Sequence, residues 1–230
     1  MVQESMTQVC SKQVWMPSEG ENLATYYDKF ATHYEEYVSA RGMQSNRVVA
    51  DMMHRYWPRS AAEPQHLMPA KVLDVGCGTG FVGKLLLTDE LLWAGSDARD
   101  LSTFSGFDIS KDMLKKASSV YQGPLLVHDV DKAPWPVTDH WADLSICNGV
   151  FIYLQNAEIL EEFIRTTAPG GHCILMFRHD ASAEWAAKRE DIERSGRWRL
   201  VEKTPDADNF PVLTNSGLAP TMFNVFCYQV

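Results

Sequence analysis

The sequence predicts an α/β protein in which a mostly parallel sheet is covered by helices on both faces. From residue 71 onward, short apolar segments alternate with segments of helical periodicity, which is typical of a doubly wound sheet. The first apolar segment runs into a glycine-rich turn at Gly76–Gly80, and ligands of such sheets bind beyond the carboxyl ends of the strands. With 230 residues, the chain is long enough for one such domain and a covering segment.

Two helices are expected before the first strand. Residues 22–37 contain no glycine or proline, and their apolar side chains recur at helical spacing, which predicts one continuous helix. A second helix is expected over residues 45–56, ending before Trp57-Pro58. Three prolines mark residues 58–70 as a linker, and residues 1–20 are expected to be loosely structured.

Seven strands and four helices are expected in the rest of the chain. Apolar runs between turn residues predict strands at residues 71–76, 105–110, 124–130, 142–150, 172–177, 197–203 and 221–230. Helical periodicity predicts helices at residues 81–87, 111–120, 157–167 and 182–195. Ser110 is placed as the N-cap of the second of these helices, Pro169-Gly170-Gly171 is expected to end the third, and Gly196 the fourth.

Composition and charge exclude several classes of protein. The formal net charge of −9 disfavours nucleic acid as a partner, because a negative surface repels phosphates. No apolar run approaches the roughly 20 residues of a membrane helix, and the N-terminus lacks the apolar core of a signal peptide, so a cytoplasmic location and no membrane partner are expected. The five cysteines are scattered and form no CxxC pair, which argues against a disulfide framework and against a metal site.

The glycine-rich turn after the first strand carries the strongest chemical signal. Its glycines, Gly76, Gly78 and Gly80, let the backbone turn tightly and let a ligand lie close to the main chain. A dinucleotide fingerprint would place its last glycine where the chain has Phe81. Asp74 at the end of the strand would disfavour a pyrophosphate but would suit an ammonium or a sulfonium. A dinucleotide-dependent oxidoreductase remains the alternative at this point.

The segment from Val72 to Gly80 resembles motif I of the class I S-adenosylmethionine-dependent methyltransferases. Residues 104–110 and the helix after them resemble the second strand of that family, whose final carboxylate holds the two ribose hydroxyls. We assign this role to Asp108, although it lies 32 residues after Gly76, where an interval of about 20 is usual. Residues 88–103 are then an insertion, and Asp97, at the end of the segment LLWAGSD, is the alternative ribose ligand.

Further resemblances follow in the order of the family, up to about residue 178. Residues 126–130 resemble the segment whose aspartate meets the adenine amino group, a role that falls to Asp129, with a loop carboxylate that caps nearby amides as the alternative. Asn148 would lie beside the reactive methyl group, and Phe151 would line the site. Ala168–Gly171 resembles the turn into the fifth strand.

The first helix resembles a segment found before motif I in many members that act on small molecules. The stretch from Tyr27 to Glu35 resembles the pattern YDxxAxxYD, with Glu35 in place of the last aspartate. In those members this stretch folds over the cofactor as a lid; the alternative is an ordinary packed helix face. There is also a resemblance to the methyltransferase-like proteins of the Williams–Beuren region. We therefore expect an N-terminal extension with a lid helix, residues 1–45, and a Rossmann-like domain with a seven-stranded sheet, residues 46–230.

The resemblance implies S-adenosylmethionine as cofactor and a small organic acceptor that is methylated on nitrogen or oxygen. A protein-methylating enzyme and a relative that does not methylate are the alternatives. The candidates for a catalytic base are Tyr27, His128 and His179. The residues expected to bind the cofactor are Tyr27, Tyr34, Asp74, Gly76, Cys77, Gly78, Gly80, Asp108, Ile109, Met113, Asp129, Val130 and Asn148. Those expected to contact the acceptor are Tyr26, Phe30, Phe151, Tyr153 and Arg178, the last as a clamp for a carboxylate.

Overall fold

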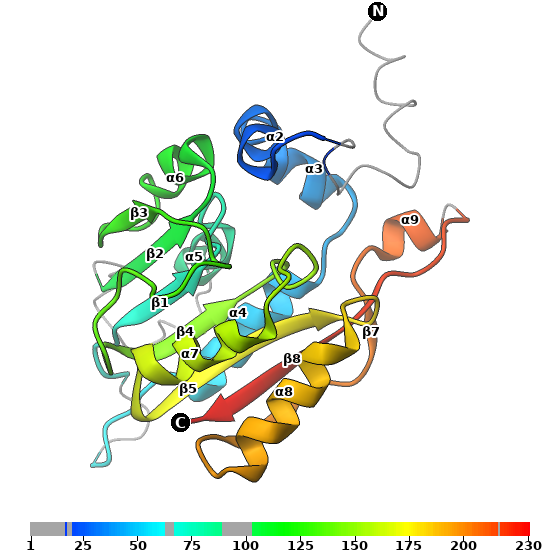
Figure 1. Cartoon of the computed structure of the whole chain (residues 1–230). Helices are drawn as coiled ribbons and strands as arrows, with labels where there is room; N and C mark the ends of the chain where they lie inside the picture. Colours follow the sequence, from blue (N-terminus) through cyan, green and yellow to red (C-terminus); the bar gives the residue numbers. More distant parts are fainter. Residues whose placement is uncertain (1–16, 18–19, 63–66, 89–102, 216) are drawn as a thin grey trace, which may run out of the picture.

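A twisted sheet of eight strands forms the centre of the part of the chain described by the computed structural model, namely residues 17, 20–62, 67–88, 103–215 and 217–230 (Figure 1). The strand order is β3-β2-β1-β4-β5-β8-β6, and β7 pairs with β8. The strands are β1 (Val72–Val75), β2 (Phe104–Asp108), β3 (Leu125–Val127), β4 (Ala142–Cys147), β5 (Thr167–Arg178), β6 (Arg199–Lys203), β7 (Ala207–Asp208) and β8 (Met222–Gln229).

The sheet is mixed, which corrects the expected seven-stranded, mostly parallel arrangement. Strands β1 to β5 pair in parallel, whereas β8 pairs antiparallel with β5, β6 and β7. Parallel neighbours need a crossover connection of a dozen or more residues, usually a helix. Strands β6 and β7 are joined by three residues and lie one after the other along the same edge of β8, so this short link does not have to cross the sheet.

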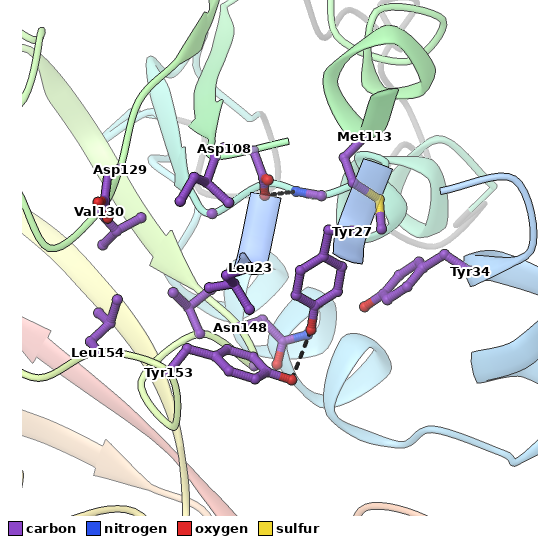
Figure 2. A pocket seen from close by; sticks show the side chains of 15 residues that line it. Leu23, Tyr27, Tyr34, Asp108, Met113, Asp129, Val130, Asn148, Tyr153 and Leu154 are labelled. Atoms are coloured by element: carbon purple, nitrogen blue, oxygen red, sulfur yellow. Dashed lines mark hydrogen bonds between the residues drawn. The ribbon is translucent and has the colours of Figure 1, made fainter. Parts of the chain in front are cut away.

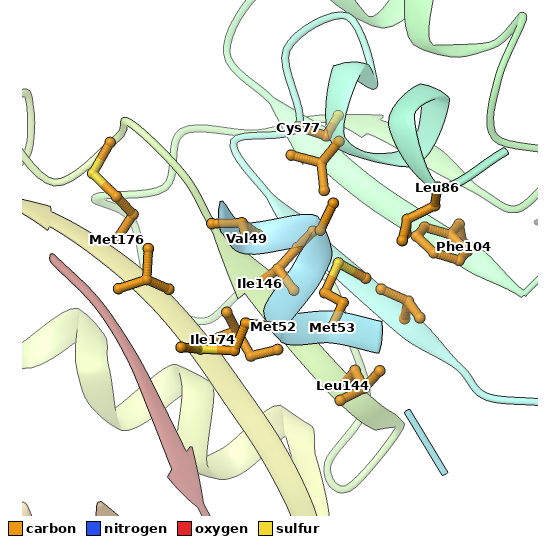
Figure 3. Packing of buried hydrophobic residues seen from close by; sticks show 14 of the residues in the cluster. Val49, Met52, Met53, Cys77, Leu86, Phe104, Leu144, Ile146, Ile174 and Met176 are labelled. Atoms are coloured by element: carbon orange, nitrogen blue, oxygen red, sulfur yellow. The ribbon is translucent and has the colours of Figure 1, made fainter. Parts of the chain in front are cut away.

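Helices cover both faces of the sheet. The helical elements are α2 (Leu23–Phe30), α3 (Tyr34–Ala40), α4 (Ser45–Tyr56), α5 (Phe81–Thr88), α6 (Lys111–Ala117), η1 (Ala157–Ile159), α7 (Leu160–Thr166), α8 (Ala183–Arg194) and α9 (Pro211–Asn215). Side chains of α4 and α5 pack on one face, where Met52 and Met53 lie against Leu144 and Ile174 (Figure 3). Side chains of α7 and α8 form a second cluster on the other face. Successive residues of a strand point to opposite faces, so the buried strands supply both clusters.

The segment predicted as one helix over residues 22–37 is instead two helices, α2 and α3. The amide of His33 donates to the carbonyl of Phe30, a tighter bond than the α-helical one, and the chain changes direction there. The turn brings the Phe30 ring against the rings of Tyr34 and Tyr37, at centroid distances of 5.8 and 5.0 Å. Packing between aromatic side chains thus accompanies a break that helical periodicity did not indicate.

Strand β5 begins five residues before the predicted position. Pro169-Gly170-Gly171 was expected to form a turn, but it lies within the strand. The amide of Gly170 donates to the carbonyl of Val230, and the amide of Val230 donates to the carbonyl of Gly171. Pairing with the C-terminal residues therefore keeps this segment extended. Strand β7 and helix α9 were not predicted, and most of residues 1–20 and of the proposed insertion 88–103 lie outside the described residues.

The described part of the chain holds no helix that could cross a membrane. Its longest helices, α4 and α8, have 12 residues each, whereas a span needs about 20.

Candidate functional site

A cavity of about 610 Å³ lies beyond the carboxyl ends of the parallel strands, beneath helix α2 (Figure 2). Every residue expected to bind the cofactor lines it, except Asp74, Cys77 and Gly80. The lining residues are Leu23, Tyr27, Tyr34, Gly76, Gly78, Asp108, Ile109, Met113, Asp129, Val130, Asn148, Gly149, Val150, Tyr153 and Leu154.

The glycine-rich turn between β1 and α5 forms one side of the cavity. Gly76 and Gly78 have φ angles of +68° and +53°, a backbone region that side chains disfavour. A Cβ atom on Gly76 would lie 2.5 Å from Cγ2 of Val150, so this position is closed to larger residues. A Cβ atom on Gly78 would have no heavy atom within 4 Å. Open space therefore faces the backbone at Gly78, where a ligand can approach closely.

Asp108, the last residue of β2, faces this turn with its carboxylate. One oxygen accepts a hydrogen bond from the amide of Gly78 at 2.9 Å, and the other accepts one from the amide of Ser110 at 2.9 Å. Burial raises the pKa of Asp108, and the hydrogen bonds from these amides oppose that change. A carboxylate has about four acceptor positions, so both oxygens can still accept from neighbouring hydroxyls of a ligand.

Asp74 lies behind the turn rather than in the cavity. Its carboxylate is buried and accepts a hydrogen bond from the hydroxyl of Tyr121 at 2.6 Å. Burial raises the pKa of Asp74 to about 7. Cys77 is buried as well, and Gly80 lies close to Ala117 of α6. In the described structure these three residues support the turn, and a direct contact with a ligand stays a prediction.

Asn148 lines the cavity and carries a buried acceptor without a hydrogen-bond partner among the described residues. Its side-chain Nδ2 donates to Oδ1 of Asn46 at 2.6 Å, which orients the amide. Its own Oδ1 is buried and has no hydrogen-bond partner among the described residues. An orphaned acceptor is costly unless a ligand satisfies it. Asn46, a buried residue of α4, was missed from the sequence; its polar side chain in a helix with an apolar buried face was the available signal.

Helix α2 borders the cavity and forms two hydrogen bonds with residues that follow β2 and β4. The hydroxyl of Tyr27 donates to the hydroxyl of Tyr153 at 2.8 Å (Figure 2). Asp28 accepts from the hydroxyl of Ser110 at 2.6 Å, next to the end of β2. Burial raises the pKa of Tyr27 and, to about 12, that of Tyr153, so both phenols stay neutral at neutral pH.

The remaining predicted residues do not line this cavity. Phe151 is buried in the core, stacked on Phe177 at a centroid distance of 4.2 Å. Arg178 is paired with Asp180, and Tyr26 and Phe30 pack on each other at 5.9 Å on α2. Of the candidate bases, Tyr27 lines the cavity but the two histidines do not: His128 Nε2 contacts the carbonyl of Lys132, and His179 Nε2 contacts Asn224. Gly149 and Val150, which line the cavity, were not predicted from the sequence, because the order of the motifs does not show which residues of this loop face the cavity and which, like Phe151, face the core.

The lining residues fit an adenosyl amino acid better than a dinucleotide. The charged side chains that line the cavity are the carboxylates of Asp108 and Asp129. They disfavour a pyrophosphate, whereas hydroxyls, an amino group and a sulfonium are compatible with them. The open space at Gly78 and the free acceptor of Asn148 lie in the same cavity. S-adenosylmethionine carries ribose hydroxyls, an amino group and a sulfonium.

Comparisons with known proteins agree with this geometry. The model of a family described as "methyltransferase domain" matches residues 73–175. Over 91 residues, the chain is 32% identical to a malonyl-[acyl-carrier protein] O-methyltransferase of Neorickettsia risticii, a match that covers 35% of this chain and 33% of the relative. The chain thus matches about one third of the length of this curated relative.

Solved structures show the same fold at low sequence identity. A TehB-like S-adenosylmethionine-dependent methyltransferase from Corynebacterium glutamicum is similar with a TM-score of 0.59 and 18% identity, covering 89% of this chain and 98% of the other. The [4+2]-cyclase SpnF is similar with a TM-score of 0.55 and 12% identity, covering 80% of each chain. Residues 73–175 thus match a methyltransferase domain, and the described chain has the fold of solved S-adenosylmethionine-dependent methyltransferases.

Proposed function

We propose that the protein transfers a methyl group from S-adenosylmethionine to a small organic acceptor with a nitrogen or oxygen nucleophile. The observation that carries this proposal is the shared cavity of Asp108, the open turn at Gly78 and the free acceptor of Asn148. A cavity covered by α2 favours a small acceptor over a protein chain, which would need an open groove. The net charge of −9 also disfavours nucleic acid.

Each lining group has a proposed role toward the cofactor. Asp108 accepts from the ribose hydroxyls, and Asp129 with Val130 meets the adenine. Asn148 accepts from the amino group at the other end, since its Oδ1 is unpaired among the described residues. When bound, the cofactor supplies a methyl group already activated by a sulfonium.

The residues of this chain then align the acceptor with the methyl group and exclude water. Methyl transfer is an in-line displacement, so holding the acceptor in register provides much of the rate. Tyr27 and Tyr153 join α2 to the loop after β4 and would close the cavity over the bound molecules as a lid. Both phenols have raised pKa values, so they suit hydrogen bonding rather than the role of a base. We therefore propose an acceptor whose nucleophile is already unprotonated at the working pH.

A non-methylating function is the second candidate. The same fold occurs in a protein named as a [4+2]-cyclase, and a fold does not by itself define a reaction. Turnover with a methyl-labelled donor over a library of amines, phenols and carboxylic acids tests the proposal. Labelled product with at least one acceptor supports it. Tight cofactor binding without any labelled product would favour the second candidate.

Replacing Tyr27 by phenylalanine is expected to reduce turnover more than it reduces stability. The change removes one hydroxyl and its bond to Tyr153 but keeps the ring that packs beside it. We expect a loss of about tenfold in kcat and about 1 kcal/mol in the free energy of unfolding. Initial rates with labelled donor and thermal unfolding of the same preparation measure the two effects.

Tyr56→Phe is the matched control for this substitution. Tyr56 lies on α4 outside the cavity, and its hydroxyl bonds the side chain of Glu202. It should show a similar small change in stability with normal turnover. If Tyr27→Phe lowers stability strongly and leaves turnover normal, α2 is a packing element rather than a lid.

A further inference from the structure

A second cavity, of about 880 Å³, opens between helix α8 and the strands β5, β6 and β8. Figure 1 shows α8 lying alongside β8. The residues that line this second cavity differ from those that line the cofactor cavity. They include two aromatic rings of the core, Phe177 and Phe226, together with Arg189 and Lys203. This combination of an apolar floor with cationic side chains is not used by the proposed methyl transfer.

Arg189 is held in place without a carboxylate partner among the described residues. Its Nε donates to the carbonyl of Trp185 at 3.3 Å, and its Nη1 donates to the hydroxyl of Tyr228 at 3.0 Å. The guanidinium carbon lies 4.5 Å from the ring centroid of Phe177 and 4.0 Å from that of Phe226. These contacts fix the plane of the guanidinium. Its Nη2 has no hydrogen-bond acceptor within the described chain, so a fork of donors remains for a ligand.

Lys203 adds a second positive charge over the same floor. Its Nζ lies 5.5 Å from the ring centroid of Phe226. It forms no ion pair within 4 Å of any described residue, but its charge helps to lower the pKa of Asp206 in the same cavity. Neighbouring cations behave differently: Lys188 is paired with Glu158 and Glu161, and Arg197 with Glu161. Arg189 and Lys203 therefore face one cavity, and neither forms an ion pair with a described residue.

The carboxylate that lines this cavity, Asp206, is engaged by its neighbours. It accepts from Nδ2 of Asn224 at 2.8 Å, and His179 lies 3.7 Å away. The same amide nitrogen donates to the carbonyl of Thr204, which leaves Oδ1 of Asn224 as the acceptor for Nε2 of His179 at 2.8 Å. Nδ1 of His179 is therefore available as a further polar contact.

We propose that this cavity is a second ligand site, which binds a small organic anion through a carboxylate or a phosphate group. The planar fork of Arg189 suits the two oxygens of either group, and Lys203 adds a mobile point charge. The rings of Phe177 and Phe226 keep the guanidinium from turning away. Binding there does not depend on the cofactor cavity.

Calorimetric titration of the full chain with malonate and with inorganic phosphate tests the proposal, with neutral malonamide as the uncharged probe. At least one anion should bind, and malonamide should not. Preference for malonate would identify a carboxylate ligand, and preference for phosphate a phosphate ligand. The indole NMR signals of Trp185, which lines the cavity, and of Trp198, whose Nε1 donates to the carbonyl of Arg189, should shift during the titration.

Substitutions separate this site from a general salt effect. Arg189→Gln should weaken anion binding at least about tenfold, and Lys203→Gln about threefold, because each removes one cation from the site. Arg194→Gln is the control on the same helix, since Arg194 is exposed and paired with Asp191; it should change nothing. Lys203 is exposed, so its substitution remains informative if Arg189→Gln fails to fold. Absence of anion binding, or equal binding by all three variants, would overturn the proposal.

Discussion

Asp108→Asn is expected to weaken the binding of S-adenosylmethionine about 100-fold, because charge-assisted hydrogen bonds contribute about 1.5–3 kcal/mol each and 1.4 kcal/mol is a factor of ten. Both oxygens of Asp108 already accept from backbone amides, those of Gly78 and Ser110. An asparagine would have to turn its NH₂ group toward one of these donors. The glycine-rich turn would therefore shift as well, and a modest fall in Tm should accompany the loss of affinity. Calorimetric titration and thermal unfolding of the variant measure both effects.

Asp112→Asn is the matched control. Asp112 is an exposed residue of α6, close to Asp108 in the sequence but outside the cavity lining. It should bind the cofactor normally. The alternative ribose ligand, Asp97, lies outside the described residues, so it is tested by Asp97→Asn. Normal affinity in Asp108→Asn together with a large loss in Asp97→Asn would overturn the assignment of Asp108.

Gly78→Ala is expected to reduce cofactor affinity at least about tenfold, because the added methyl group would occupy space that the ligand needs. No heavy atom lies within 4 Å of the position of the new Cβ, so the protein itself offers no clash. The φ angle of +53° costs an alanine about 1–2 kcal/mol, which sets the expected loss of stability. Titration with the cofactor, alongside denaturant unfolding, distinguishes the two contributions.

Gly196→Ala is the matched control, because it introduces the same backbone strain at a position outside the cofactor cavity. Gly196 follows α8, has a φ angle of +74°, and likewise has no heavy atom within 4 Å of an added Cβ. Its stability should fall by a similar amount, and its cofactor affinity should not change. If both variants bind equally well, the space at Gly78 is not where the ligand lies.

Local sequence signals predicted the elements that depend on local interactions. Helix α4 has the predicted bounds, residues 45–56, because an apolar face and a following proline define it. Ser110 caps α6 as expected, its hydroxyl accepting from the amide of Met113. The glycine-rich turn and the carboxylate at the end of β2 also meet in one cavity, since parallel strands end at the same edge of a sheet.

The features that the sequence did not reveal depend on contacts between distant segments. The break between α2 and α3 accompanies the packing of Phe30 on Tyr34 and Tyr37. The early start of β5 depends on pairing with Val230 at the other end of the chain. Asn46 orients Asn148 across more than 100 residues of sequence. Periodicity and short motifs contain no information about such partners.

Calorimetric titration of the purified chain with S-adenosylmethionine, its demethylated product and NAD tests most directly whether the cavity at Gly76–Gly80 holds an adenosyl amino acid. The arrangement of Asp108, Asp129 and Asn148 predicts binding of the first two compounds at a single site and no binding of NAD. Uptake of NAD or a flavin by a chain that ignores S-adenosylmethionine would contradict it.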